Sequence, residues 1–331
     1  MSGVLVRGGC GPFPHDYLEI ATLGHRLGVV MLDTVRGCVR QALFGAVLAG
    51  PLASQTPAPG SPLGPGRPAV TPEFIAHEVE RAQTYLVLMY TLGPTPRTNA
   101  GHVAATQQQH LEYLFNLRRA GRLTGQGPIL EGGELRGIGF LVGVNEDEAR
   151  QLAAADPHVK AGYLDAHVFR WIGLPGDSLP PVGPTDVRSP VPGVGPSSGT
   201  ERPAVTPEFI AREIARAQTY VVRLYTLGPR SRTDPAHLAV TQQHHLEYLF
   251  GLRRAGLLTL AGPVLQGPVL EIGELRGIGI LVGVDEAQAR ELAAADPHVE
   301  AGYLRAHVFR WMGLPGDSLP HVERIDVNSR P

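Results

Sequence analysis

The sequence has very little cysteine. Cys10 and Cys38 are the only two in 331 residues, and both lie near the N-terminus. The rest of the chain therefore has no disulfide framework, no thiolate nucleophile and no cysteine ligand for zinc. Stability must come from hydrophobic cores, and a hydrophobic content of 43% is enough for two domains of ordinary size.

The sequence also has no excess of charge of one sign. Lys and Arg total 29 against 31 Asp and Glu, which gives a formal net charge of -2. Nucleic-acid binding relies on a basic field that neutralises the phosphate backbone, and the composition supplies none. We therefore expect no nucleic-acid partner.

No apolar run near the N-terminus is long enough to span a membrane. In the segment 1–67, the run Ala42–Ala53 follows two arginines and precedes small residues around Ser54 and a Pro/Gly-rich stretch. It is shorter than the roughly 20 residues that a spanning helix needs, and its surroundings are typical of a secretory signal. If Met31 is the functional start, residues 31–54 predict export to the periplasm or medium. Otherwise the run is an ordinary apolar helix and the protein is cytoplasmic.

The remainder of the chain contains one sequence twice. Residues 68–128 align with 203–263, with 43 of 61 positions identical, and residues 134–180 align with 274–320, with 39 of 47 identical. The offset grows from 135 to 140 between the two blocks, so the second copy has five extra residues within 264–273. Two copies of this length indicate a pair of domains rather than a solenoid.

The domain boundaries follow from the repeats and from a Pro/Gly/Ser-rich stretch between them. We expect an N-terminal segment at 1–67, a first domain at 68–180, a linker at 181–202, a second domain at 203–320 and a tail at 321–331.

Each copy has the residue patterns of four strands and two helices. An apolar stripe closed by Gly121 predicts a helix at Thr106–Ala120, with Thr106 and Gln109 as a capping box unless the helix begins earlier, near Thr98. Asn145 and Glu148 predict a second capping box, and the helix that it opens ends before Pro157. The strands are predicted at Thr84–Leu92, Arg122–Leu130, Arg136–Val144 and Tyr163–Trp171.

The resulting order, β-α-β-β-α-β, is the split ferredoxin-like motif of an α+β fold. Two helices cover one face of a four-stranded sheet and leave the other face open. We expect the second copy to cover that face, so that the two ferredoxin-like βαββαβ domains form an intramolecular pseudo-dimer in a monomeric protein.

Three short motifs recur in both copies: a His-Leu-Glu-Tyr-Leu segment, a Gly-Pro pair and an Asp-Pro-His segment. They begin at His110, Gly127 and Asp156 in the first copy, and at His245, Gly262 and Asp296 in the second. In these motifs the chain resembles the YCII (YciI-like) family, over about two thirds of its length. The resemblance implies a dimeric α+β barrel with a His-Asp pair in a pocket. One branch of that family eliminates chloride from chlorinated hydroxyquinols.

Carried over by position, the resemblance pairs His110 with Asp156 and His245 with Asp296. Two departures concern the outer wall of the pocket. The last strand ends Phe169-Arg170-Trp171, where relatives commonly have a proline before the aromatic residue, and each copy has an extra leading segment, such as 68–82.

A His-Asp pair supports proton transfer, because the carboxylate orients the imidazole and stabilises its charged form. Neither copy has a cysteine or a serine in a nucleophile-elbow pattern, which disfavours acyl transfer. Phosphate-binding and dinucleotide-binding patterns are also absent, so we expect no cofactor. The sequence predicts a small-molecule lyase or isomerase with His110, Asp156, His245 and Asp296 as catalytic residues.

Three alternatives stay open. His110 lies on the helical stripe of Leu114 and Leu117 and is equally typical of a core histidine, while Asp156 suits a helix stop before a proline. The same pocket also suits a non-catalytic exported protein that binds a small ligand. A metal-binding protein is the third alternative, because four histidines recur per copy without a metal-site spacing: His102/His237, His110/His245, His158/His298 and His167/His307.

The paired arginines at the end of the first helix, Arg118-Arg119 and Arg253-Arg254, are interpreted as solvated helix ends that favour the helix dipole rather than as an anion site.

Overall fold

The computed structural model describes residues 70–182 and 204–322. We call these ranges the first half and the second half. The predicted export signal at 31–54 lies outside the described residues, as do nearly all of the predicted linker and tail.

Both halves repeat one order of elements, preceded in each case by an extra helix. The first half contains α3 (Pro72–Arg81), β1 (Gln83–Leu92), α4 (Ala100–Arg119), β2 (Leu123–Leu130), β3 (Leu135–Leu141), α5 (Glu146–Ala155), α6 (Pro157–Lys160) and β4 (Leu164–Gly173). The second half contains α7 (Pro207–Arg216), β5 (Gln218–Leu227), α8 (Pro235–Arg254), β6 (Leu258–Gln266), β7 (Val269–Leu270), β8 (Gly273–Leu281), α9 (Glu286–Ala294), α10 (Pro297–Glu300) and β9 (Leu304–Gly313). The five extra residues of the second copy fall around β7, which pairs with the start of β8.

The predicted βαββαβ order is confirmed in both halves, and of the two starts considered for the first long helix the earlier one, near Thr98, is confirmed. Helix α4 begins at Ala100, where the side chain of Asn99 accepts the backbone N–H of His102 at 3.1 Å. Thr106 lies inside this helix, and its hydroxyl donates to the carbonyl of His102 at 2.7 Å, so it forms no capping box. The capping box of Asn145 and Glu148 is present, with both bonds at 2.9 Å.

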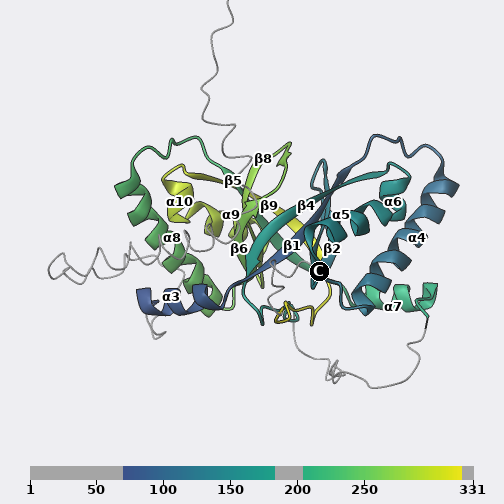
Figure 1. Ribbon diagram of the computed structural model, residues 1–331, viewed down its shortest axis with the longest axis horizontal. Helices are drawn as coiled ribbons and strands as arrows, with labels where there is room; N and C mark the ends of the chain where they lie inside the picture. Colours follow the sequence, from purple (N-terminus) through teal and green to yellow (C-terminus); the bar gives the residue numbers. More distant parts are fainter. Residues whose placement is uncertain (1–69, 183–203, 323–331) are drawn as a thin grey trace, which may run out of the picture. The chain divides into compact units, whose positions relative to one another are not determined.

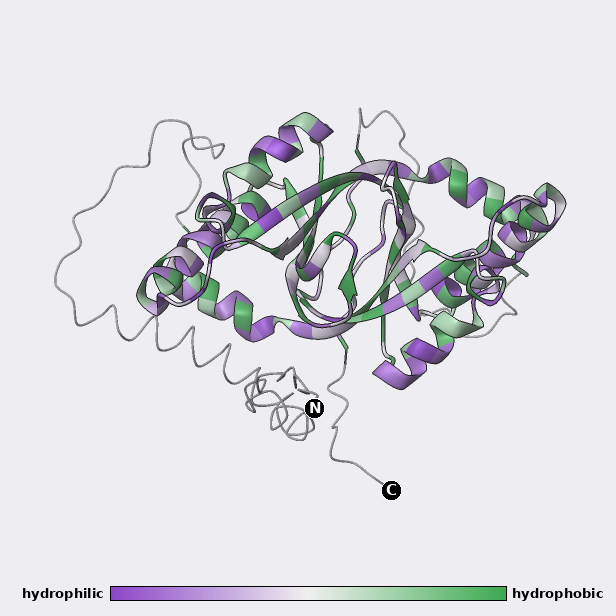
Figure 2. Ribbon diagram, turned by 90° about the horizontal axis from the view of Figure 1, so that it is seen from above, coloured by the Kyte–Doolittle hydropathy of each residue, from purple (hydrophilic) through white to green (hydrophobic). Residues whose placement is uncertain are grey.

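The strands of both halves form one closed antiparallel barrel. Its order is β5-β9-β2-β3-β1-β4-β6-β8, and pairing of β5 with β8 closes the ring. Two seams join the halves: β2 pairs with β9 through Ile129 and Trp311, and β4 pairs with β6 through Trp171 and Val264. The view from above shows the strands in the centre and the helices on two opposite sides of them (Figure 2). The expected intramolecular pseudo-dimer is therefore a single barrel.

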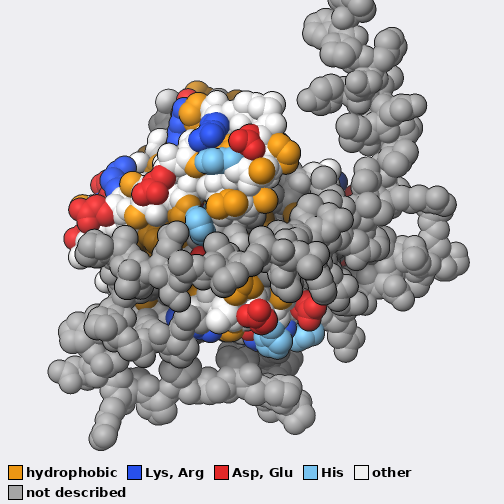
Figure 3. Space-filling model, turned by 90° about the vertical axis from the view of Figure 1, so that its left-hand side faces the viewer, with side chains coloured by type: hydrophobic (Ala, Val, Ile, Leu, Met, Phe, Trp, Pro, Cys, Tyr) orange, Lys and Arg blue, Asp and Glu red, His pale blue; other side chains and the backbone are white. Residues whose placement is uncertain are grey.

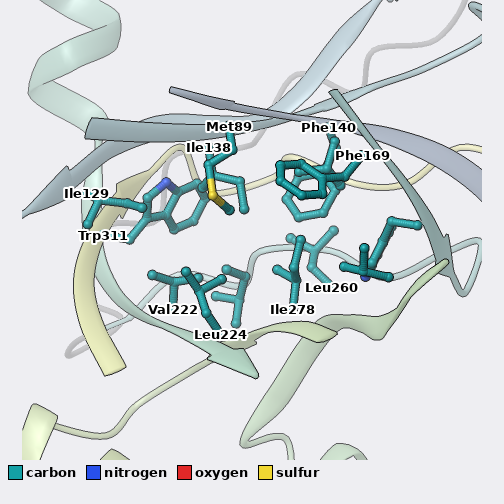
Figure 4. Packing of buried hydrophobic residues seen from close by; sticks show 14 of the residues in the cluster. Met89, Ile129, Ile138, Phe140, Phe169, Val222, Leu224, Leu260, Ile278 and Trp311 are labelled. Carbon is teal, nitrogen blue, oxygen red and sulfur yellow. The ribbon is translucent and has the colours of Figure 1, made fainter. Parts of the chain in front are cut away.

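Apolar side chains from both halves fill the barrel. Met89, Ile138 and Phe140 point inward from the first half and meet Val222, Leu224 and the other labelled residues of the second half (Figure 4). Because strand side chains alternate between faces, the next residues along each strand point outward to the helices. Each sheet of the pseudo-dimer thus buries its open face against the other.

A matched pair of tryptophans fixes the seams. The Trp171 indole N–H donates to the carbonyl of Gly262 at 2.9 Å, and Trp311 donates to the carbonyl of Gly127 at 3.0 Å. A Cβ at Gly127 would lie 1.7 Å from the carbonyl oxygen of Met312, and one at Gly262 would meet the opposite strand in the same way. The glycine of each Gly-Pro motif is therefore required by close approach of the other half's backbone.

The leading helices cross between the halves. Helix α3 packs on α8, where the rings of Phe74 and Phe250 lie 5.6 Å apart, and α7 packs on α4, where Phe115 and Phe209 lie 5.7 Å apart (Figure 1). The segment that departs from the family pattern thus extends the contact between the halves.

The helix-end arginines also take part in this contact. Arg118 forms an ion pair with Asp317, whose side chain is buried, and Arg253 binds Asp177 with Nη1–Oδ1 at 2.5 Å and Nη2–Oδ2 at 2.7 Å. The interpretation of Arg118 and Arg253 as solvated helix ends is therefore wrong. Each one joins the end of a long helix to the C-terminal loop of the opposite half.

The part of the surface visible in Figure 3 is mixed in character: Lys and Arg, Asp and Glu, His and apolar side chains are interspersed there. None of the helices in the described residues combines the length and the apolar character that a membrane span requires.

Candidate active site

A histidine and an aspartate meet beneath the long helix of each half. His110 is on α4 and Asp156 lies between α5 and α6, and the distance from His110 Nδ1 to Asp156 Oδ1 is 2.7 Å. In the second half His245 Nδ1 lies 2.7 Å from Asp296 Oδ1. Both aspartates are fully buried, whereas each histidine retains 9% of its exposure. The structure therefore brings together the residues of both predicted pairs.

The carboxylate of Asp156 is held by three donors. Besides His110, the backbone N–H of His158 donates to Oδ1 at 2.8 Å, because Asp156 caps the short helix α6, and the Tyr90 hydroxyl donates to Oδ2 at 2.9 Å. Burial alone raises the pKa of Asp156, but the hydrogen bond and charge of His110, with the bonds from His158 and Tyr90, lower it below its usual value. The carboxylate is therefore ionised at neutral pH.

An ionised Asp156 fixes the role of the histidine. A carboxylate without a proton only accepts, so Nδ1 of His110 carries the hydrogen of their bond. Nε2 then remains as the ring nitrogen that exchanges protons with a ligand. The same argument holds for His245, because the pKa of Asp296 is also lowered: burial raises it, and the bond and charge of His245, the charge of Arg223 and the Tyr225 bond outweigh burial.

Tyr90 and Tyr225 belong to the site, although sequence reasoning missed them. Tyr225 donates to Asp296 Oδ2 at 2.5 Å, as Tyr90 does to Asp156. Burial, followed by the nearby aspartate, raises the pKa of Tyr90 well above its usual value, so the phenol stays a donor. The sequence did offer a signal for them: a tyrosine stands at the equivalent position of the apolar strand segment in both copies.

A second histidine stacks on the first. The rings of His110 and His158 lie 4.5 Å apart and 10° from parallel, and His245 and His298 repeat this arrangement. Burial, with the charges of His110 and Arg97, lowers the pKa of His158 to about 4, so its ring is neutral at neutral pH. Its Nε2 is buried and has no hydrogen-bond partner among the described residues.

The remaining recurrent histidines lie elsewhere. His102 contacts the Tyr163 hydroxyl through Nδ1 at 2.7 Å. His167 contacts the Thr91 hydroxyl at 2.9 Å and lines a cavity of about 470 Å³ at the β4–β6 seam. A smaller cavity of about 220 Å³, lined by His307, lies at the β2–β9 seam. The residues of the His-Asp pairs line neither of these two cavities.

Across residues 70–182 and 204–322, no three His, Cys, Asp or Glu side chains are grouped so that they could hold a metal ion. The metal-binding alternative therefore has no donor set in the described part of the chain.

A buried residue beside the pair differs between the two sites. Arg223 on β5 is 1% exposed, and its counterpart on β1 is Leu88, equally buried. The Arg223 guanidinium carbon lies 4.5 Å from the centre of the Tyr225 ring, beside the hydroxyl that binds Asp296. A charged residue in an otherwise apolar strand was visible in the sequence, but its proximity to the pair was not.

The closed barrel and a His-Asp pair beneath each long helix define a class of duplicated α+β barrel proteins. The YCII-related domain matches residues 85–172 and again residues 219–312. The chain therefore belongs to the YCII-related family, as a tandem duplication of its domain.

Several solved structures are similar to the chain. They include a heme-binding protein from Thermus thermophilus (12% identity, TM-score 0.37, covering 70% of this chain and 92% of that one). A mutant chlorite dismutase from Candidatus Nitrospira defluvii has 10% identity and a TM-score of 0.39 over 70% of this chain and 91% of that one. An anthrone oxidase-like protein has 11% identity and a TM-score of 0.36 over 72% and 94%. Likeness at this level says nothing about the ligands of this chain.

Among curated proteins, none matches the chain significantly in sequence.

Proposed function

We propose that the chain is a small-molecule lyase or isomerase in which each half carries one acid–base site. The observation that supports this best is the pair itself: a buried, ionised aspartate 2.7 Å from Nδ1 of a histidine whose ring retains some exposure. Such a carboxylate orients the imidazole and stabilises the imidazolium that forms during proton transfer. Asp156 and Asp296 are positioning residues, and His110 and His245 are the proton carriers.

The proposed cycle needs only a proton shuttle. Nε2 of His110 or His245 accepts a proton from a phenol or an acidic C–H of the substrate. In an elimination, the freed electron pair forms the new double bond while the carbon–chlorine bond breaks and chloride leaves with its bonding electrons, and the imidazolium then releases its proton to water. In an isomerisation, the imidazolium returns the proton to another carbon. Both reactions balance without an oxidant, a reductant or a second substrate.

Resemblance to the branch that acts on chlorinated hydroxyquinols makes these compounds the first probes. Chloride release from a chlorohydroxyquinol is followed in the whole protein and in His110→Gln, His245→Gln and the double variant. We expect each single variant to keep the turnover of the other half and the double variant to lose it. The control is His77→Gln, because the side chain of His77 is 67% exposed on α3.

For isomerisation, exchange of acidic C–H for deuterium in small enolisable ketones is followed by NMR in the same set of proteins. Retention of either activity by the double variant would show that the pairs are not the proton carriers.

A second candidate is a non-catalytic protein that binds a small ligand. The observation that favours it is the cavity of about 470 Å³ at the β4–β6 seam, which includes Glu146, Arg150 and His167 but neither member of the His-Asp pair. A binding protein would show a ligand-dependent rise in melting temperature without turnover. This rise would disappear in His167→Gln and persist in His110→Gln. Export through residues 31–54 remains part of this proposal, and N-terminal sequencing of secreted protein tests it.

A further inference from the structure

The two halves differ by a buried charge at equivalent positions of β1 and β5. Leu88 lies opposite Gly139, and Arg223 lies opposite Gly279. The neighbouring strand compensates for the size of the arginine. Gln126 in the first half is replaced by Ala261 in the second half, and a Cβ at Gly279 would lie 3.3 Å from Ala261 and 3.6 Å from the Arg223 guanidinium. The Arg223 guanidinium therefore lies beside Gly279 in space that the smaller Ala261 leaves open.

The guanidinium of Arg223 is incompletely satisfied. Its face lies on the Tyr225 ring, with 4.5 Å between the guanidinium carbon and the ring centre. Its Nε and Nη1 are buried, and neither has a hydrogen-bond partner among the described residues. A buried cation with unpaired N–H groups is strongly unfavourable, so these groups indicate a partner from outside the chain.

Asp296, the nearby anion, is already committed to other donors. Its Oδ1 accepts from His245 and from the backbone of His298, and its Oδ2 accepts from Tyr225. Arg97 and its counterpart Arg232 act in the same way on the stacked histidines His158 and His298, whereas the positive charge of Arg223 has no counterpart at Leu88. The second site thus favours a negative ligand more than the first site does.

We propose that the second site accepts a ligand with an anionic group, a carboxylate or phenolate, which Arg223 binds through its unpartnered N–H groups. Nε–H and Nη1–H point to different edges of the guanidinium plane, and each can give a charge-assisted hydrogen bond to an anionic oxygen. The first site, with Leu88 in this place, takes the neutral ligand. Arg223 is then the specificity-determining residue that separates the two sites. This inference concerns the same site as the proposed function, but it requires binding only.

Benzoate and acetate are the anionic probes, and benzamide and acetamide are their neutral counterparts of the same shape. Binding to the whole protein is measured by titration calorimetry at constant ionic strength. We expect one anion per chain and weaker binding of either amide. The variant Arg223→Leu/Ala261→Gln copies the residues of the first half, which keeps the packing matched. We expect it to weaken benzoate binding about tenfold to a hundredfold, as loss of a charged hydrogen bond does.

The reverse variant, Leu88→Arg/Gln126→Ala, gives the first half the residues of the second. We expect it to bind two anions per chain, and it tests the proposal even if the other variant folds poorly. The proposal is wrong if neither anion binds the wild type more tightly than its amide, because Arg223 then meets only water. It is also wrong if the Arg223→Leu/Ala261→Gln variant binds benzoate as tightly as the wild type does.

Failure of this proposal and failure of the proposed function are distinguishable. Anion binding involves no proton transfer, so it is measured independently of turnover. Both proposals are supported if the histidine variants lose turnover and the wild type binds the anions more tightly than the amides. Selective anion binding with no turnover of any probe would leave a binding protein whose second half recognises anions.

Discussion

The two halves share their machinery and differ in its surroundings. The His-Asp distance is 2.7 Å in both, and a tyrosine and a stacked histidine occupy the same places. Position 88 is a buried leucine in the first half, whereas position 223 is a buried arginine beside the aspartate's tyrosine. Because both halves lie in one chain, one half can carry a buried charge that a homodimer would have at both sites.

Removal of both proton carriers has the largest expected effect on this pair of sites. We predict that His110→Gln/His245→Gln lowers turnover by about 10²- to 10⁴-fold, the usual contribution of a general acid–base group. Each single variant keeps the turnover contributed by the other half. A difference in turnover between the two single variants would measure how far the activities of the two sites differ. Steady-state kinetics on the probe that turns over gives these values.

The next largest effect is a difference between the two halves in the free energy of unfolding that is lost when the aspartate of the pair is replaced. Asp296→Asn leaves Arg223 buried without a neighbouring negative charge, and we expect a loss of about 3–5 kcal/mol in the free energy of unfolding. Asp156→Asn removes a charge-assisted hydrogen bond in a half without that arginine, and we expect about 1–2 kcal/mol. Urea unfolding measures both losses. If Arg223→Leu does not restore stability to Asp296→Asn, the two groups are not coupled.

The seams, by contrast, should respond symmetrically. We expect Gly127→Ala and Gly262→Ala each to cost about 3 kcal/mol or somewhat more, because a Cβ would overlap a carbonyl of the opposite half. Gly101→Ala in α4 is the control, since the nearest atom to its new Cβ would be 3.6 Å away and alanine favours a helix by about 1 kcal/mol. Strongly unequal losses in thermal unfolding would show that the halves are not matched at the seams.

The last prediction is a dependence of stability on pH that both halves share. Burial lowers the pKa of both His158 and His298 from 6.5 to about 4, so the unfolded chain binds more protons between these values. The free energy of unfolding should therefore fall as the pH falls from about 6.5 to about 4. The variant His158→Gln/His298→Gln should show a flatter dependence over that range. If the variant kept the slope of the wild type over that range, the two rings would bind a proton as readily in the folded protein as in the unfolded chain.

Local signals and the repeat predicted most of the fold. Alternation, turn residues and the Asn145 capping box located the strands and the second helix, and an uncovered sheet face predicted the pseudo-dimer. The sequence left the start of α4 open between Thr98 and Thr106, because a threonine hydroxyl can either cap a helix or, as Thr106 does, donate to a carbonyl within it. The crossed helices α3 and α7 were missed because nothing local determines which half they contact.

The candidate site was predicted in part. Family motifs gave His110 and Asp156, and their distance supports that pairing. Tyr90, the stacking of His158 and the approach of Arg223 to Tyr225 depend on residues that meet only in the folded chain. The ion pairs of Arg118 and Arg253 were missed for the same reason. From the sequence alone, an arginine at a helix end that pairs with the opposite half cannot be told from one that points into solvent.

The central claim is that an ionised aspartate holds Nδ1 of each histidine and leaves Nε2 for the substrate. Histidine ¹⁵N NMR reports it most directly, with His110→Gln and His245→Gln used to assign the signals. We predict that the neutral forms of His110 and His245 carry their hydrogen on Nδ1, with a strongly deshielded proton in the bond to the aspartate. A hydrogen on Nε2 in the neutral form of both histidines would contradict the account, because neither could then accept a proton from a substrate there.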